Sequence, residues 1–318
     1  MVERSAVNRL VVGSSPTSGA IFRTAPQQPI KFGGTISCSS WPQPTSREPA
    51  HFLAIFSIRM IFGFFKERRR RQLRARPFPA AWKAIVSRNV ALFSHLPVED
   101  QTELLGHVQV FLAEKHFEGC GGLELTDEIR LTIAAQACLL LLHRASDYYP
   151  ELVTILVYPS SYTAKEERYL GNNIWEAGGE NRFGHTGRQM GSLVLAWDEA
   201  RRGAADPADG ANLVLHEFAH QLDFEDFATD GAPALGTRAE YFAWARVMRR
   251  EFEALRSAET AGVPTVLDTY GATNPAEFFA VATEAFFEQP NALRTRQPEL
   301  YAELARFYRQ NPVEYFAD

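Results

Sequence analysis

The segment His216-Glu-Phe-Ala-His220 holds the residues best suited to chemistry in this chain. On an α-helix, positions i and i+4 lie one turn apart on the same face, so both imidazoles can reach one metal ion. Glu217 projects about 100° away, where its carboxylate can contact a metal-bound water. This is the zinc metalloprotease arrangement, with two histidine ligands and Glu217 as general base. The alternative is a pair of hydrogen-bonded core histidines beside a solvent-facing Glu217.

A zinc site of this kind needs a third protein ligand. No histidine follows His220, and Asp223 and Asp226 stand where the metzincin pattern requires Gly and His. The third ligand is therefore expected to be a downstream carboxylate. Glu277 is the preferred candidate, because it lies one turn into a strongly apolar helical segment. It could instead cap that helix together with Asn274.

Other carboxylates could serve the same centre. Glu284 lies two turns beyond Glu277 on nearly the same helix face, either as a replacement ligand or as a group that orients a ligand. Asp268 is an alternative third ligand, at a spacing close to that of the aspzincins. Asp223 could orient His220 by accepting its second ring N–H, or could be a surface acid at the helix end.

Two further residues have candidate roles. The phenol of Tyr270 could donate a hydrogen bond to the oxyanion that develops during peptide hydrolysis, or it could be a packed loop tyrosine. His185 lies in a glycine-rich loop and is either a fourth ligand or an ordinary loop histidine.

The elements that position these residues follow from hydrophobic periodicity. The residues flanking the two histidines are apolar nearly all round, which predicts a buried helix over 211–224. The order of elements favours a helix-rich α+β or mainly α fold with a small sheet. Together with the paired histidines, it predicts a single zincin-like metallopeptidase domain. We expect the second strand to pair with the substrate backbone. The other predicted helices span 79–93, 97–117, 126–142, 238–256, 275–288 and 298–309; strands are predicted at 152–158 and 192–197, and a linker at 203–210.

Composition supports a globular protein: 46% of the 318 residues are hydrophobic. No apolar run reaches the roughly 18 residues needed to span a bilayer. The nearest run, 52–65, contains Arg59 and precedes a basic cluster, whereas a secretory signal has its positive charges first. A cytoplasmic protein is predicted. Its three scattered cysteines exclude a disulfide framework.

The chain divides into three parts. Residues 1–59, rich in Ser, Thr, Pro and Gly, are expected to be a disordered tail, or a misassigned extension if Met60 is the true start. Residues 60–76 carry seven basic residues and one acid and are expected to form a solvated basic arm, or a contact for an anionic membrane or acidic partner. Residues 77–318 form the predicted catalytic domain. Their 20 basic and 35 acidic residues argue against direct nucleic-acid binding.

The chain resembles the Mlc titration factor family of bacterial zinc metallopeptidases. The likeness extends from about Phe62 to the C-terminus. It is carried by P-F-P-A-A-W (77–82), L-V-L-A-W (193–197), L-H-E-F-A-H-Q-L-D (215–223), D-T-Y-G-A-T-N-P-A-E-F-F-A-V (268–281) and F-Y-R-Q-N-P (307–312).

The resemblance implies a gluzincin-like domain and a cytosolic peptidase that binds one Zn²⁺ and has aminopeptidase-like activity on small substrates. It places the ligands at His216, His220 and Glu277, with Glu217 as general base. Some members also bind a glucose-responsive transcriptional repressor and so influence sugar uptake. In some members an additional upstream histidine is associated with zinc, but residues 171–184 contain no histidine.

A second function class stays open from the sequence. The protein could act mainly as a binding module that sequesters a transcriptional regulator, with zinc in a structural or vestigial role. It could also be a peptidase that stays latent until a partner opens the site.

Overall fold

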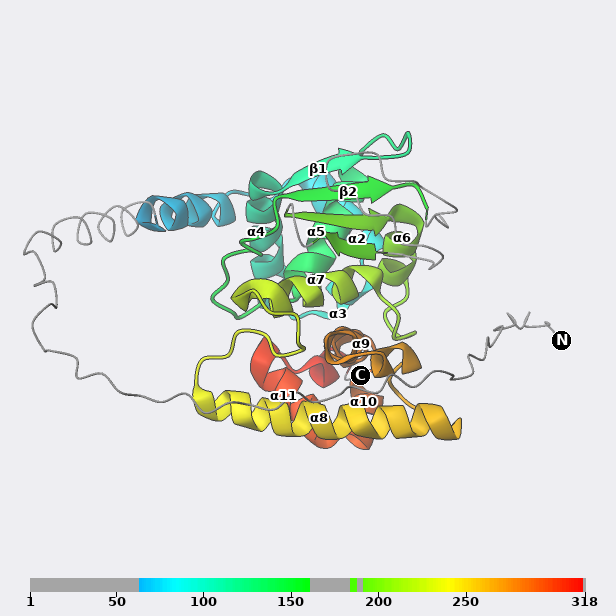
Figure 1. Ribbon diagram of the computed structural model, residues 1–318. Helices are drawn as coiled ribbons and strands as arrows, with labels where there is room; N and C mark the ends of the chain where they lie inside the picture. Colours follow the sequence, from blue (N-terminus) through cyan, green and yellow to red (C-terminus); the bar gives the residue numbers. More distant parts are fainter. Residues whose placement is uncertain (1–62, 161–183, 188–190, 317–318) are drawn as a thin grey trace, which may run out of the picture. The chain divides into compact units, whose positions relative to one another are not determined.

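The computed structural model describes residues 63–160, 184–187 and 191–316. These belong to one compact unit, Ser57–Asp318, in which helices dominate around one small sheet (Figure 1). The prediction of a helix-rich α+β fold is therefore confirmed. The predictions for residues 1–59 and for the side chain of His185 lie outside the described residues. Within the described part of the chain, no helix is both long and apolar enough to cross a bilayer.

The sheet has four strands in the order β1-β2-β4-β3. Strands β1, β2 and β4 are parallel, and β3 runs antiparallel to β4. Ile155 in β2 lies opposite both Phe117 and Leu193, and its side chain is fully buried. The predicted strands at 152–158 and 192–197 are confirmed, whereas β1 and β3 were not predicted. The bounds are His116–Gly119 (β1), Thr154–Tyr158 (β2), Gly184–Gly187 (β3) and Ser192–Ala196 (β4).

The helices follow the predicted order with several differences, among them α10 (Pro290–Arg296), which was not predicted, and α8 (Arg238–Ala261), which ends at Ala261 instead of 256. The helix predicted over 79–93 is interrupted at Val90, and the helix predicted over 97–117 ends at Glu114, because Val90 and Lys115 take extended backbone conformations. A helix also occupies the start of the predicted linker. The bounds are Ala80–Asn89 (α2), Ala91–His95 (α3), Val98–Glu114 (α4), Asp127–Leu139 (α5), Trp197–Ala205 (α6), Leu213–Asp223 (α7), Arg238–Ala261 (α8), Pro275–Glu288 (α9), Pro290–Arg296 (α10) and Pro298–Tyr308 (α11).

Helix α7 lies between the sheet and α9 (Figure 1). Its Phe218 is fully buried, with its ring centroid 4.8 Å from that of Tyr149 and 5.7 Å from that of Phe111. Burying one phenylalanine contributes about 1.5–3 kcal/mol of stability. The packing of Phe218 against Phe111 and Tyr149 therefore helps to fix the orientation of α7 about its own axis. This orientation determines where the face with His216 and His220 points.

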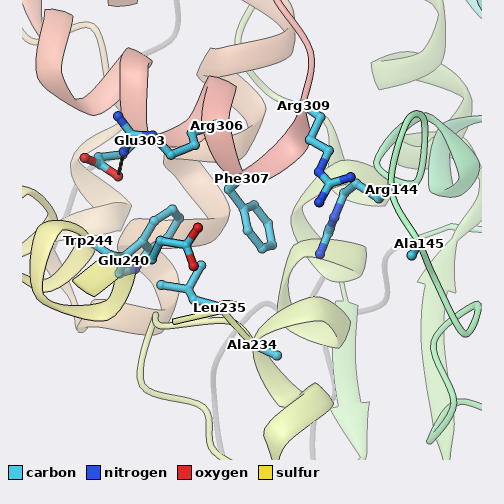
Figure 2. A pocket seen from close by; sticks show the side chains of 11 residues that line it. Arg144, Ala145, Ala234, Leu235, Glu240, Trp244, Glu303, Arg306, Phe307 and Arg309 are labelled. Carbon is cyan, nitrogen blue, oxygen red and sulfur yellow. Dashed lines mark hydrogen bonds and ion pairs between the residues drawn. The ribbon is translucent and has the colours of Figure 1, made fainter. Parts of the chain in front are cut away.

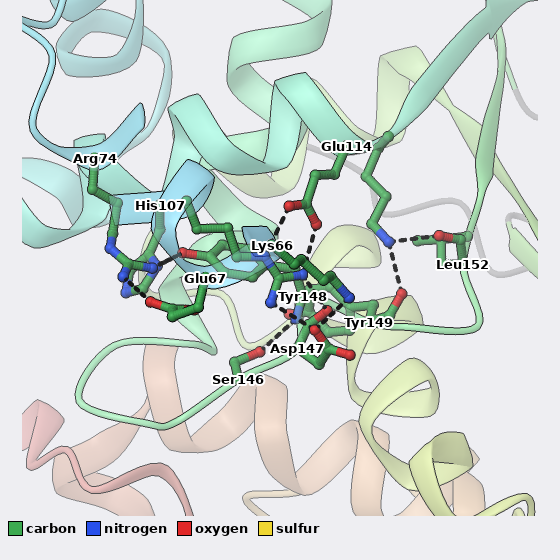
Figure 3. Close-up of polar contacts among 12 residues, drawn as sticks. Lys66, Glu67, Arg74, His107, Glu114, Ser146, Asp147, Tyr148, Tyr149 and Leu152 are labelled. Carbon is green, nitrogen blue, oxygen red and sulfur yellow. Dashed lines mark hydrogen bonds and ion pairs between the residues drawn. The ribbon is translucent and has the colours of Figure 1, made fainter. Parts of the chain in front are cut away.

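Most of the described residues of the basic segment are exposed, and Arg70 is an exception. Residues 63–74 are helical, and Arg70 within them is only 3% exposed. Its guanidinium donates two hydrogen bonds to the Glu114 carboxylate, at 2.8 and 2.7 Å. It donates one to the Asp147 carboxylate at 2.6 Å and one to the Asp147 carbonyl at 3.1 Å. Figure 3 labels these two partners. The neighbouring Arg69 is exposed, which agrees with the solvated arm that the sequence predicted. This helix is thus anchored to α4 and to the loop after α5 through one buried arginine.

Candidate metal centre

Two capped helices bring the candidate residues together. Asn212 caps α7, because its Oδ1 accepts a hydrogen bond from the Leu215 N–H at 3.0 Å. Asn274 caps α9 in the same way, with its Oδ1 3.0 Å from the Glu277 nitrogen. The predicted cap is present, but the Glu277 side chain turns toward the histidines of α7. Glu277 therefore takes part in the helix cap through its backbone N–H, while its side chain remains available to the two histidines.

Three side chains from α7 and α9 converge on one point. His216 Nε2 lies 3.2 Å from His220 Nε2 and 3.0 Å from Glu277 Oε2. The third separation, from His220 Nε2 to Glu277 Oε2, is 3.4 Å. All three residues are partly buried, and together they form a group with the spacing of metal ligands. The structure thus brings together residues that are 61 positions apart in the sequence.

The group carries strong internal electrostatics. Burial lowers the pKa of His216, but hydrogen bonds to Glu277 and Glu284 outweigh it and raise the pKa to about 10. Burial alone would raise the pKa of Glu277. Hydrogen bonds to His216 and His220 and their charges outweigh burial and lower this pKa to about 2. The site therefore stabilises a positive charge beside two carboxylates.

Glu284 takes the orienting position rather than a place in the ligand group. His216 Nδ1 donates a hydrogen bond to Glu284 Oε1 at 2.7 Å, and the Asn212 backbone N–H donates to Glu284 Oε2 at 2.6 Å. Asn212 also donates from Nδ2 to Glu288 Oε1 at 2.9 Å. Burial raises the pKa of Glu288 to about 9, so this carboxyl is protonated at neutral pH. Asn212 and Glu288 were not predicted to matter, although an asparagine before a helical segment is a typical cap signal.

Glu217 and Tyr270 lie beside this group. Glu217 is 6% exposed, and its charge contributes to the raised pKa of His216. Tyr270, in the short 3₁₀ helix Thr269–Ala272, has its ring centroid 6.1 Å from that of His216. Its side chain is 56% exposed, so one side of the ring faces solvent. The position of each is compatible with its predicted role, which stays a prediction.

Asp268 does not join the histidines. Its Oδ1 accepts a hydrogen bond from the Tyr270 N–H at 2.7 Å and so caps the 3₁₀ helix. The prediction that Asp223 orients His220 is also not met. Asp223 is fully buried, its Oδ2 accepts from the Gly231 N–H at 3.0 Å, and its Oδ1 has no hydrogen-bond partner among the described residues. Burial raises the pKa of Asp223 to about 6.

The expected pairing of substrate with the strand at 192–197 is wrong. Strand β4 is hydrogen-bonded to β2 on one side and to β3 on the other. Because Gly184–Gly187 pairs with β4 from Ser192 to Leu195, this part of β4 has no free edge for a peptide.

A helix that carries two histidines, facing a carboxylate from a second helix, is the architecture of a metallopeptidase-like domain. Residues 64–309 match the sequence model of the glucose-regulated metallo-peptidase M90 family. The chain belongs to this family, and the family implies a bound metal.

Named relatives agree with this assignment. The chain is 40% identical over 258 residues to an uncharacterized protein of Synechocystis sp., covering 80% of this chain and 94% of that protein. It is 30% identical over 230 residues to Mlc titration factor A of Yersinia pestis (strain Pestoides F), covering 71% of this chain and 83% of that protein. The same values hold for Mlc titration factor A of Yersinia pseudotuberculosis serotype O:1b (strain IP 31758). The resemblance seen in the sequence motifs is confirmed.

Proposed function

We propose that this protein is a zinc-dependent peptidase that binds one Zn²⁺ per chain through His216, His220 and Glu277. The observation that carries the proposal is the triangle of donor atoms, with sides of 3.0, 3.2 and 3.4 Å. Tetrahedral zinc with bonds near 2.1 Å places its ligand atoms about 3.4 Å apart. Two imidazoles and one carboxylate are also the ligand set of the thermolysin-type catalytic site, which keeps its fourth position open.

The surroundings of the triangle suit a cation. The carboxylates that raise the pKa of His216 would stabilise a metal ion at the same place. Glu284 holds the Nδ1–H of His216, so that Nε2 is the nitrogen directed toward His220 and Glu277. A carboxylate behind a histidine ligand is the usual support of a zinc site.

The proposed chemistry is hydrolysis of a peptide bond. Bound zinc supplies Lewis acidity and lowers the pKa of water to near neutrality. In this proposal Glu217 accepts a proton from the attacking water and then donates it to the leaving amine. Tyr270 donates a hydrogen bond from its phenol to the oxyanion. Glu277 would bind the metal as its third ligand, and Glu284 would hold the His216 ring in place through its hydrogen bond to Nδ1.

Metal analysis and turnover of the full chain test the proposal together. The purified wild type should hold one zinc per chain, and His216→Ala should lose it. His95→Ala is the matched control, since His95 is exposed and lies outside the triangle. Glu217→Gln should keep zinc and abolish turnover. Full activity of Glu217→Gln, or unchanged zinc in His216→Ala, would contradict the proposal.

Aminopeptidase-like specificity is the finer part of the proposal. An enzyme of this kind cleaves an aminoacyl-p-nitroanilide with a free α-amino group and does not cleave its N-acetylated form. Equal rates on the two substrates would exclude the aminopeptidase assignment and leave the peptidase assignment intact.

The name of the Yersinia relatives, Mlc titration factor A, supports a second function. We propose that this chain binds an Mlc-like transcriptional repressor and thereby affects sugar uptake, in the cytoplasm where such a repressor acts. Binding of the purified repressor to wild type and to Glu217→Gln separates the alternatives. Equal binding, with no peptide cleaved by wild type, favours a sequestering module. Cleavage that appears only with the repressor present favours a latent peptidase.

A further inference from the structure

A cavity of about 230 Å³ lies away from the proposed zinc ligands, and none of its lining residues belongs to that group. It opens between the segment after α5, the loop before α8, and α11 (Figure 2). Arg144 and Arg309 lie on one side, the Phe307 ring lies next to them, and Glu240 and Trp244 lie opposite (Figure 2). The cavity therefore has three arginines in its lining, beside the aromatic residues Trp244 and Phe307.

Arg144 is the unusual residue of this cavity. Its Nη1 is buried and has no hydrogen-bond partner, and its guanidinium makes no hydrogen bond or ion pair with any described residue. Arg144 as a whole is partly buried. Its guanidinium carbon lies 4.1 Å from the centroid of the Phe307 ring and 6.0 Å from that of Tyr308, in cation–π contacts. Buried guanidinium groups in proteins are normally paired with an anion.

The other charges of the cavity do not supply that anion. Glu303 forms an ion pair with Arg306. Glu240 accepts a hydrogen bond from Thr237 Oγ1 at 3.0 Å at the start of α8 and pairs with no arginine among the described residues. Arg309 adds a second positive charge and lowers the pKa of Arg144 further, after the larger effect of burial. Glu225 acts on Arg144 only through its charge, with no direct contact in the described part of the chain.

We propose that this cavity is a binding site for a small organic carboxylate with an apolar body, held by Arg144 and Arg309. The planar guanidinium binds a carboxylate through two parallel hydrogen bonds. Trp244 and Phe307 line the cavity, and the apolar body of the ligand packs against the small part of these rings that is exposed, mainly the edge of Phe307. This inference is independent of the proposed peptidase activity.

Calorimetric titration of the zinc-loaded full chain with phenylacetate, acetate and inorganic phosphate tests the site. Phenylacetate should bind, and more tightly than acetate, because only its ring reaches the aromatic walls. Arg144→Gln should weaken phenylacetate binding at least about tenfold, since it removes charged hydrogen bonds. Zinc binding by this variant should equal that of wild type, because Arg144 lies outside the group of candidate ligands; a loss of affinity for phenylacetate then reports the cavity.

Two more variants keep the test decisive. Arg309→Gln changes an exposed side chain and should weaken binding without loss of folding, even if Arg144→Gln unfolds. Arg249→Gln removes the same charge from an exposed position on α8, paired with Glu253, and should bind as wild type does. The site would be excluded by undetectable phenylacetate binding at about 10 mM, by unchanged binding in both Arg144→Gln and Arg309→Gln, or by binding of phosphate alone.

Discussion

His216 Nδ1 donates a hydrogen bond to Glu284 Oε1 across 2.7 Å, which joins α7 to α9 immediately behind the proposed zinc ligands. The other carboxylate oxygen of Glu284 accepts a hydrogen bond from the Asn212 backbone N–H, so both oxygens are held in place. An imidazole fixed in this way cannot rotate about its own axis without breaking a charged hydrogen bond. Glu284 is thus a positioning residue for His216.

Glu284→Gln should weaken zinc binding by about tenfold to a hundredfold, the usual effect of altering a group that supports a ligand. The amide keeps the size of the side chain but loses its charge. Competition with a chromogenic chelator measures the affinity. Glu253→Gln, an exposed change on α8, is the control. An affinity within twofold of wild type would show that Glu284 does not position His216.

Glu288→Gln should make stability less dependent on pH. The folded-state pKa of Glu288 is about 9 and the ordinary value is 4.5, so between these values the folded chain binds a proton that the unfolded chain has released. Stability then falls as pH rises, by up to about 1.4 kcal/mol per pH unit from this group. Glutamine is neutral in both states and removes that contribution.

Urea unfolding of the zinc-saturated proteins from about pH 6 to about pH 8 checks this prediction. The advantage of Glu288→Gln over wild type should grow with pH. Glu259→Gln, at an exposed position, should follow the wild-type curve. Parallel curves for wild type and Glu288→Gln would contradict a protonated Glu288.

Gly231→Ala should destabilise the fold strongly. Gly231 has a φ of 78°, and a Cβ there would collide with the backbone oxygen of Pro275 at the start of α9. Its N–H and carbonyl also bind Asp223 and Trp244. Gly262 has a similar φ of 65° with open space around it. Gly231→Ala should therefore cost about 2 kcal/mol more than Gly262→Ala in free energy of unfolding. Equal costs would mean that the collision is relieved by a small shift.

Arg70→Gln should lower the free energy of unfolding by on the order of 3 kcal/mol, because it leaves Glu114 without its buried partner. Arg69→Gln, one residue earlier and exposed, should change it by less than about 0.5 kcal/mol. Chemical denaturation of both variants gives the comparison. Similar values for the two would restore the interpretation of residues 60–76 as a solvated arm.

The α7 site could be predicted because its geometry is local. The spacing of His216 and His220 places both rings on one helix face wherever the helix lies, and the apolar flanks show that the helix is buried. Glu277 was also preferred from sequence, since it lies early in a second apolar helix. The role of Glu284 was left open between replacement ligand and orienting group, because seven residues along α9 leave it on nearly the same face as Glu277.

Tertiary structure decided what depends on partners distant in sequence. Strands β1 and β3 are short, and it is pairing with β2 and β4 that defines them. The burial of Arg70 depends on Glu114 and Asp147, which no periodicity within 60–76 can reveal. The amino-acid sequence alone determined most of the helices and the two histidines one turn apart, since those follow from short-range backbone geometry. Only the folded chain decided which carboxylate meets which imidazole nitrogen, because that depends on how α9 packs against α7.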